Sequence, residues 1–217
     1  MKMKRNKIIA TLTFMLVLPF YGLSQDSNLG NWLIYIGSKE LKNGWNIHNE
    51  VQYRNYDAVG DLEQLLLRTG LGCNLTENNN NILSENYVGD TDQKVSVNEH
   101  RIFQQFTTKQ NVGVLDLSHR YRFEQRFVED DFKMRFRYFL GLKIPLQNKA
   151  DGNNPLYLSA YNEIFLNTKS EIFDRNRLYG GLGYEFSKQL RLELGYMNQF
   201  FETSSRDQIN IMAFVNF

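Results

Sequence analysis

Three histidines, and the serine beside one of them, are the residues of this chain best suited to acid–base or nucleophilic chemistry. The histidines are His48, His100 and His119, and Ser118 directly precedes His119. Acyl transfer needs a serine within hydrogen-bond reach of a base, but neighbours in an extended strand point to opposite faces. His48 and Glu50 can pair on one face, and no serine stands in an evident relation to them. We therefore expect no catalytic residues and interpret each histidine as a polar or interfacial side chain.

Motifs that would hold a metal or a cofactor are also missing from the sequence. There is no HExxH motif and no His/Asp cluster with metal-ligand spacing. The single cysteine, Cys73, argues against a disulfide framework and against a thiolate metal cluster. The glycines of residues 180–183 lie inside a strand-like segment, where they favour bending or close packing of bulky neighbours over phosphate binding. We expect neither a metal nor a cofactor.

Arginine and glutamate recur at alternate positions of several segments, with apolar residues between them. Arginine forms planar, bidentate ion pairs with carboxylates and is suited to buried ionic networks. If the apolar residues face lipid, the charged ones face the interior of a barrel. The predicted interior network consists of Glu50, Arg54, Arg68, Arg120, Arg122, Glu124, Arg126, Arg135, Arg137, Glu163, Arg175, Arg177, Glu185, Arg191 and Glu193.

This network permits two interpretations, because a small barrel has a narrow lumen that side chains largely fill. In the first, the charges form salt bridges that plug the lumen. In the second, a positively charged lining passes or binds small anions. The local excess of arginine over residues 120–126 and 133–137 motivates the second interpretation.

The elements that would carry these residues are long β-strands. A period of two dominates from Trp32 to the end of the chain, and the clearest hairpin runs from Arg177 to Phe201. We count about eleven strand-like segments of mostly 9–14 residues, separated by polar turn formers. This length suits a tilted strand that crosses a bilayer and exceeds the ~5–6 residues usual in soluble strands.

The sequence therefore predicts an all-β fold, an antiparallel transmembrane β-barrel. Bacterial single-chain barrels have an even number of strands, whereas the segments found here are odd in number. If the last strand descends to the periplasm, the segment Asn31–Gly37 descends as well. We predict 10 or 12 strands, with that segment short of a full span or one short strand overlooked. Aromatic residues, Trp32 and Trp45 among them, are expected to form girdles at the membrane interfaces.

The first residues have the pattern of an export signal. Four cations precede an apolar run over residues 8–18, and small residues then suit cleavage after Ser24. The apolar run is shorter than the ~20 residues of a membrane-spanning helix. We predict a signal peptide at 1–24 and an outer-membrane barrel domain at 25–217. The net charge of +1 gives no electrostatic case for nucleic-acid binding.

The C-terminal residues point to a location in the cell outer membrane. Ile209, Ile211, Val215 and Phe217 share one face, and the chain ends on an aromatic residue. This resembles the signal that outer-membrane barrels present to the barrel-insertion machinery. We expect that machinery and the outer-membrane lipid to be partners of the chain. The last strand of a soluble sandwich could show the same alternation.

Several strings after Ser118 carry a family resemblance that extends over the mature chain. They are RYRFEQR at 120–126, RFR at 135–137 with IPL at 144–146, NEIFLN at 162–167, DRNRLY at 174–179 and LGYMNQ at 194–199. They resemble DUF2490, a family of uncharacterised proteins common in the Bacteroidetes. The resemblance implies an outer-membrane barrel without an established activity, and it supplies no catalytic residues.

Three functions stay open on the sequence alone. The first, which we expect, is a structural or small-pore barrel, porin-like in kind, whose Arg/Glu lining would favour small anions. The second is a barrel enzyme that acts on lipids. The third is a soluble periplasmic β-barrel that binds a ligand.

Overall fold

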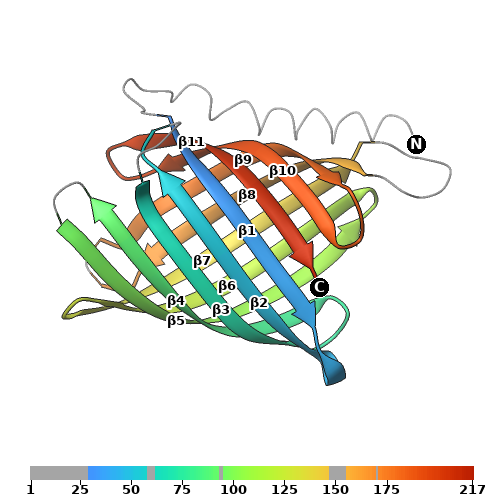
Figure 1. Ribbon diagram of the computed structural model, residues 1–217, viewed down its shortest axis with the longest axis horizontal. Coiled ribbons are helices and arrows are strands. Elements are labelled where there is room, and N and C mark those ends of the chain that lie inside the picture. Colours follow the sequence, from blue (N-terminus) through green and yellow to red (C-terminus); the bar gives the residue numbers. More distant parts are fainter. Residues whose placement is uncertain (1–28, 58–61, 93–94, 147–154, 170) are drawn as a thin grey trace.

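The computed structural model describes residues 29–57, 62–92, 95–146, 155–169 and 171–217 (Figure 1). The predicted signal peptide at 1–24 lies outside these residues. The strands are β1 (Gly30–Glu40), β2 (Trp45–Asn55), β3 (Leu62–Asn74), β4 (Asn79–Asp92), β5 (Val95–Val112), β6 (Leu115–Val128), β7 (Asp131–Pro145), β8 (Leu156–Asn167), β9 (Phe173–Glu185), β10 (Leu190–Phe200) and β11 (Ser205–Asn216). A 3-10 helix, η2 (Lys42–Gly44), joins β1 to β2. Among the described residues, no helix has the length and apolar character needed to cross a membrane.

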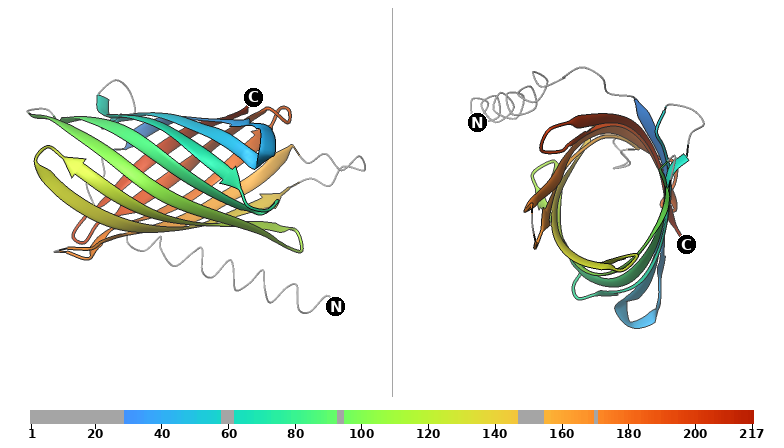
Figure 2. Two further views of the ribbon diagram at one scale, coloured as in Figure 1. Left: turned by 90° about the horizontal axis from the view of Figure 1, so that it is seen from below. Right: turned by 90° about the vertical axis from the view of Figure 1, so that its left-hand side faces the viewer.

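The eleven strands of the described residues close into one barrel (Figure 2). Each strand pairs antiparallel with the next along the chain, as β6 does with β7. The ring closes between β1 and β11, which run parallel from Gly30 opposite Gln208 to Ser38 opposite Asn216. The all-β barrel that the sequence predicts is confirmed, with one parallel pairing among the antiparallel ones.

The predicted number of 10 or 12 strands is wrong. The segment at Asn31–Gly37 is neither short nor accompanied by an overlooked strand in the described residues, because it belongs to the full-length strand β1. A parallel ladder uses the same backbone N–H and C=O groups as an antiparallel one. An odd number of strands can therefore close without a free edge when the first and last strands run in the same direction.

The two ends of the barrel differ in which connections they carry. Phe217 lies at one end, where its backbone N–H donates to the carbonyl oxygen of Ser38 at 2.9 Å. The strand order places the connections that follow β1, β3, β5, β7 and β9 at the same end, which we call the C-terminal end. The start of β1 lies at the opposite end, with the connections that follow the even-numbered strands.

The alternation of side chains gives the barrel an apolar outer face and a polar inner face. Leu83, Phe136 and Leu194 are more than half exposed on the outside, whereas Glu124 and Arg135 are buried inside. The interior is not uniformly polar, because Trp32, Ile34, Tyr179, Met197 and Met212 form a buried apolar cluster on the side of β1, β9, β10 and β11. One residue contradicts the predicted aromatic girdles: Trp32 is buried, and Arg54 stacks on its ring from the interior.

Candidate functional site

The predicted network residues lie on the inner side of the barrel, around a cavity of about 780 Å³. Most of them line this cavity directly: Glu50, Arg54, Arg68, Arg120, Arg122, Arg126, Arg135, Arg137, Glu163, Arg175, Arg177, Arg191 and Glu193. The two others bind side chains of the lining, since Glu124 pairs with Arg135 and Glu185 pairs with Lys143. The alternation of the sequence therefore assigned this whole set to the face that the structure turns inward.

Eleven interior side chains form a closed ring of contacts around the inner wall, which we call the arginine ring. Each residue contacts the next, and the last contacts the first. In order around the wall they are Trp32, Arg177, Phe165, Arg137, Glu124, Arg122, Phe103, Arg68, Glu50, Gln52 and Arg54. The ring begins on β1 and passes over β9, β8, β7, β6, β5 and β3 to β2, so it encircles the lumen.

Aromatic rings hold the guanidinium groups of the arginine ring against the wall. Arg54 and Arg177 both stack on Trp32, with their Cζ atoms 3.9 Å and 4.8 Å from its ring centre. Arg122 lies 4.1 Å from the centre of the Phe103 ring in the same way. A guanidinium is attracted to the face of an aromatic ring, and more strongly where water is excluded. These contacts fix the arginine side chains along the wall.

Glu124 is the carboxylate with the most arginine partners in the ring. Its side chain is 0% exposed, and it accepts from Nη1 of Arg137 at 2.6 Å, Nη2 of Arg135 at 2.6 Å and Nη1 of Arg122 at 3.5 Å. Arg135 also binds Asp174 on β9 at 2.8 Å. Asp174 lies near the start of β9, so this ion pair extends from the ring toward the end of the barrel opposite the C-terminal end. A buried carboxylate needs such partners, because burial without them is costly.

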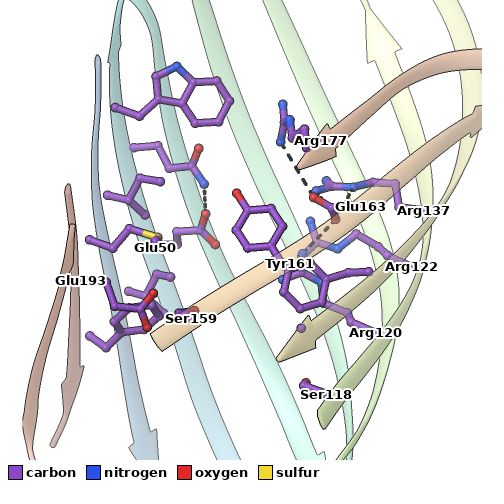
Figure 3. Close-up of a pocket in the computed structure, with 18 of the residues that line it drawn as sticks. Glu50, Ser118, Arg120, Arg122, Arg137, Ser159, Tyr161, Glu163, Arg177 and Glu193 are labelled. Atoms are coloured by element: carbon purple, nitrogen blue, oxygen red, sulfur yellow. Dashed lines mark hydrogen bonds and ion pairs between the residues drawn. The ribbon is translucent and has the colours of Figure 1, made fainter. Parts of the chain in front are cut away.

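Glu163 lies beside the ring and is also surrounded by arginines (Figure 3). It accepts from Arg137 at 2.7 Å and from Arg120 at 2.9 Å, and Arg177 lies 3.9 Å away. Across the cavity, Glu50 pairs with Arg68 and lies 3.5 Å from Nε2 of His48. Each carboxylate of the ring region is therefore shared between several cations or donors.

Positive charge exceeds negative charge in this interior. The arginine ring itself contains five arginines and two glutamates. Among the described residues that line the cavity, thirteen are arginine or lysine and six are aspartate or glutamate. The buried or paired carboxylates Glu124, Asp174 and Glu185 reduce this excess without removing it. The interior therefore has a positive electrostatic potential that favours anions.

The cavity extends from the arginine ring toward the C-terminal end, and we call this part the vestibule. It is lined by Ser118, Gly141, Lys143, Tyr157, Ser159 and Arg191. Charged side chains there are more exposed than in the ring: Lys143 is 28% and Arg191 34% exposed, against 3% for Arg122. Polar side chains of the vestibule are thus accessible to water from the cavity.

Glycines of β9 and β10 make room in the vestibule. A Cβ atom at Gly183 would overlap the ring of Tyr157, and one at Gly195 would overlap the ring of Tyr179. The hydroxyl of Tyr157 donates to Glu193 at 2.8 Å. The aromatic rings can lie against the wall only because the glycines beside them lack side chains, and within residues 180–183 this close packing applies to Gly181 and Gly183 but not to Gly180.

Sequence reasoning missed the interior residues of β5. Glu99 binds Nε of Arg101 at 2.6 Å and Nε of Arg126 at 2.5 Å, and Phe103 belongs to the arginine ring. The spacing Glu99, Arg101, Phe103 has the period of two that marks one face. The opposite face of β5 carries His100 and Gln104 among apolar residues such as Ile102, so the contrast between the two faces is weakened.

The histidines and Ser118 are dispersed. Ser118 lines the cavity, whereas His119 lies on the outer face, with Nδ1 2.9 Å from the hydroxyl of Tyr138. His48 faces Glu50 inside, and His100 lies on the outer face of β5. Within the part of the chain that the structure describes, no group of His, Cys, Asp and Glu is arranged to hold a metal ion.

The residues of the expected insertion signal all lie on the outer face of β11 or just beyond it. Ile211 and Phe217 are 48% and 66% exposed, and Ile209 and Val215 are half-buried beside them. The alternate residues Gln208 and Asn210 are buried inside. This end of the chain therefore presents an apolar strip to the surroundings of the barrel.

Comparison with known proteins gives a family match. The sequence model of DUF2490, described as a protein of unknown function, matches residues 29–210. The match begins just before β1 and ends within β11, so it covers almost the whole barrel. A search of curated proteins and a search of solved structures found no match.

Proposed function

The chain belongs to the DUF2490 family, whose function is unknown. From the geometry of its interior, we propose that it is an outer-membrane β-barrel that forms a narrow passage for small anions. The observation that carries this proposal is the arginine ring, a closed circle of contacts with five guanidinium groups and two carboxylates around a cavity. An anion that enters this circle meets guanidinium groups from β2, β3, β6, β7 and β9.

The outer face supports the location in a membrane. Large apolar side chains are exposed on every strand from β1 to β11, such as Leu33, Tyr121 and Ile211. Strands of 11 to 18 residues are long enough for a tilted crossing of the hydrocarbon core. In this proposal residues 1–24 direct export, and Ile209, Ile211, Val215 and Phe217 are presented to the barrel-insertion machinery.

Cell fractionation combined with gel mobility tests the location. A barrel that spans the membrane should stay with the outer-membrane fraction after washing with carbonate. It should also migrate differently on a detergent gel before and after boiling, because the folded barrel resists the detergent. Release with the periplasm and one mobility would contradict the location and favour a soluble ligand-binding barrel.

The anion preference can be measured on the vestibule itself. Ser159 lies on its wall, so Ser159→Cys in a Cys73→Ser background provides a single reporter thiol. Negatively and positively charged thiol reagents of equal size should differ in rate there, with the negative reagent faster, and added salt should reduce the difference. Val114→Cys, in the exposed turn between β5 and β6, is the control, because it gives the ratio of the two reaction rates for a thiol outside the cavity. Equal ratios at the two positions would contradict the proposal.

A further inference from the structure

A polar patch interrupts the apolar outer face of the barrel on β4, β5 and β6. It consists of Glu85, His100, Gln104 and Gln125, which we call the polar patch. The side chains of Glu85 and His100 are 68% and 61% exposed, with Oε1 of Glu85 3.8 Å from Nδ1 of His100. Gln104 and Gln125 exchange two side-chain hydrogen bonds of 3.4 Å and 3.2 Å across β5 and β6. All four side chains point away from the lumen.

The polar patch lies at the middle of the barrel wall rather than at its rim. Glu85 is the seventh of the fourteen residues of β4, between the outward side chains of Leu83 and Tyr87. At the centres of β10 and β11 the outward residues are the apolar Leu194 and Ile211, and the polar outward residue at the centre of β8, Asn162, is an uncharged amide that is hydrogen-bonded to Asn176. A carboxylate, an imidazole and two amides at this level would face acyl chains. Exposed to lipid, such groups are costly, and ionisable ones within a membrane mark functional contacts.

We propose that the polar patch is the centre of a two-fold interface with a second copy of this chain in the membrane. The inference rests on the membrane location under the proposed function. Covering the patch removes its groups from lipid and supplies them with hydrogen-bond partners. This assigns β4, β5 and β6 to the interface and leaves β9, β10 and β11 facing lipid.

A second copy fits the patch because the patch is complementary to itself. In a two-fold dimer of copies inserted in the same direction, the axis is parallel to the membrane normal, so each residue lies at the same depth as its counterpart. The patch contains an acceptor, Glu85, and amide donors, Gln104 and Gln125. In the register of β4 with β5, Leu83 lies opposite Gln104 and Glu85 opposite Ile102, so acceptor and donor are two residues apart on neighbouring strands. Each copy can therefore donate to the carboxylate of the other.

Apolar groups around the patch can provide the packing that such an interface needs. Leu83 and Ile102 are 58% and 44% exposed directly beside Glu85 and Gln104. A hollow of about 670 Å³ is lined by Leu83 and Gln104 together with Phe106 and Tyr121. An interface with a polar centre and an apolar surround would place the amide and carboxylate groups away from both lipid and water.

Disulfide cross-linking in native membranes tests the interface. The probe is a cysteine at position 104, Gln104→Cys, in the Cys73→Ser background, with Leu194→Cys on the far strand β10 as the matched control. Oxidation with a copper–phenanthroline complex should produce a covalent dimer of the first variant and leave the second monomeric. A Gln104→Cys chain that stays monomeric, or that is cross-linked to a different protein, would overturn the proposal.

A second variant separates loss of contact from loss of fold. Glu85→Leu suits a lipid-facing wall and should leave the heat-dependent gel mobility unchanged, while the dimer in detergent weakens about tenfold or more in analytical ultracentrifugation. An unchanged dissociation constant would contradict the interface. Fractionation of the same cells distinguishes the two proposals: protein outside the membrane contradicts both, whereas monomeric protein inside the membrane contradicts the dimer alone.

Discussion

At the scale of single residues, Glu124 is the point on which the charged interior depends. It is fully buried and accepts from Arg122, Arg135 and Arg137. Removal of the shared carboxylate would leave buried guanidinium groups with fewer counter-charges. Breaking a buried ion pair on one side costs far more than the pair itself contributes, because the remaining charge is uncompensated.

We predict that Glu124→Gln lowers the free energy of unfolding by on the order of 3 kcal/mol. The measurement is urea unfolding of the barrel in detergent, followed by gel mobility. Glu185→Gln is the matched control, since Glu185 pairs with Lys143 where both are about one third exposed, and its effect should stay below about 1 kcal/mol. Equal effects of the two variants would show that Glu124 is not the centre of the network.

Gly183 illustrates a second residue-scale constraint, because the ring of Tyr157 occupies the space of the missing side chain. We predict that Gly183→Ala destabilises the barrel by about 1–3 kcal/mol, since Tyr157 must move away from the wall and from Glu193. Gly180→Ala, on the outer face with no atom within 4 Å of the added Cβ, should have little effect. Both variants can be measured in the same urea titration. If Gly183→Ala is as stable as Gly180→Ala, the packing explanation is wrong.

At the scale of elements, the closure between β1 and β11 is the least usual feature. Tyr35 lies opposite Ala213 across this parallel seam. In a Cys73→Ser background, cysteines at positions 35 and 213 should form an intramolecular disulfide, because paired strands bring their Cβ atoms within bridging distance. Tyr35→Cys combined with Leu192→Cys on β10 is the control and should not form one. The disulfide is detected by gel mobility without reductant. A disulfide in the control pair alone would contradict the parallel register.

The strands were predictable from the sequence, whereas their closure was not. Alternation identifies a strand and its two faces, so Arg135, Arg137 and Glu163 could be assigned to the interior from their spacing. Nothing in a local pattern states which strand pairs with β1, or in which direction, because a parallel and an antiparallel ladder use the same backbone groups. The predicted number of 10 or 12 strands therefore rested only on the even number usual in bacterial barrels, and it was wrong.

Two further residues show where the pattern is insufficient. Trp32 is aromatic, and aromatic residues occur both at membrane interfaces and in stacked interior contacts, so residue type did not reveal its face. Glu99 was missed because His100 and Gln104 interrupt the apolar outer face of β5. These outward polar residues of β5 also mark the proposed dimer interface, so the failure of alternation there has a structural cause.

At the scale of the whole molecule, the barrel combines the arginine ring with the vestibule on its C-terminal side. The arginine ring surrounds the lumen with guanidinium groups that aromatic rings hold along the wall, and the vestibule continues to the C-terminal end. Because the ring contains more arginines than carboxylates, it should repel cations and attract small anions, and the barrel should select by charge as well as by size.

Current through single barrels in a planar lipid bilayer tests this account most directly. With a salt gradient of potassium chloride across the bilayer, we predict small conductance steps. We also predict a reversal potential that is shifted from zero toward the equilibrium potential of chloride. Replacing Arg137 and Arg177 by glutamine should move the reversal potential toward zero, as long as gel mobility shows a folded barrel. Folded protein that gives no steps would contradict the passage and leave a plugged, structural barrel, and a reversal potential on the potassium side would contradict the role of the arginine ring.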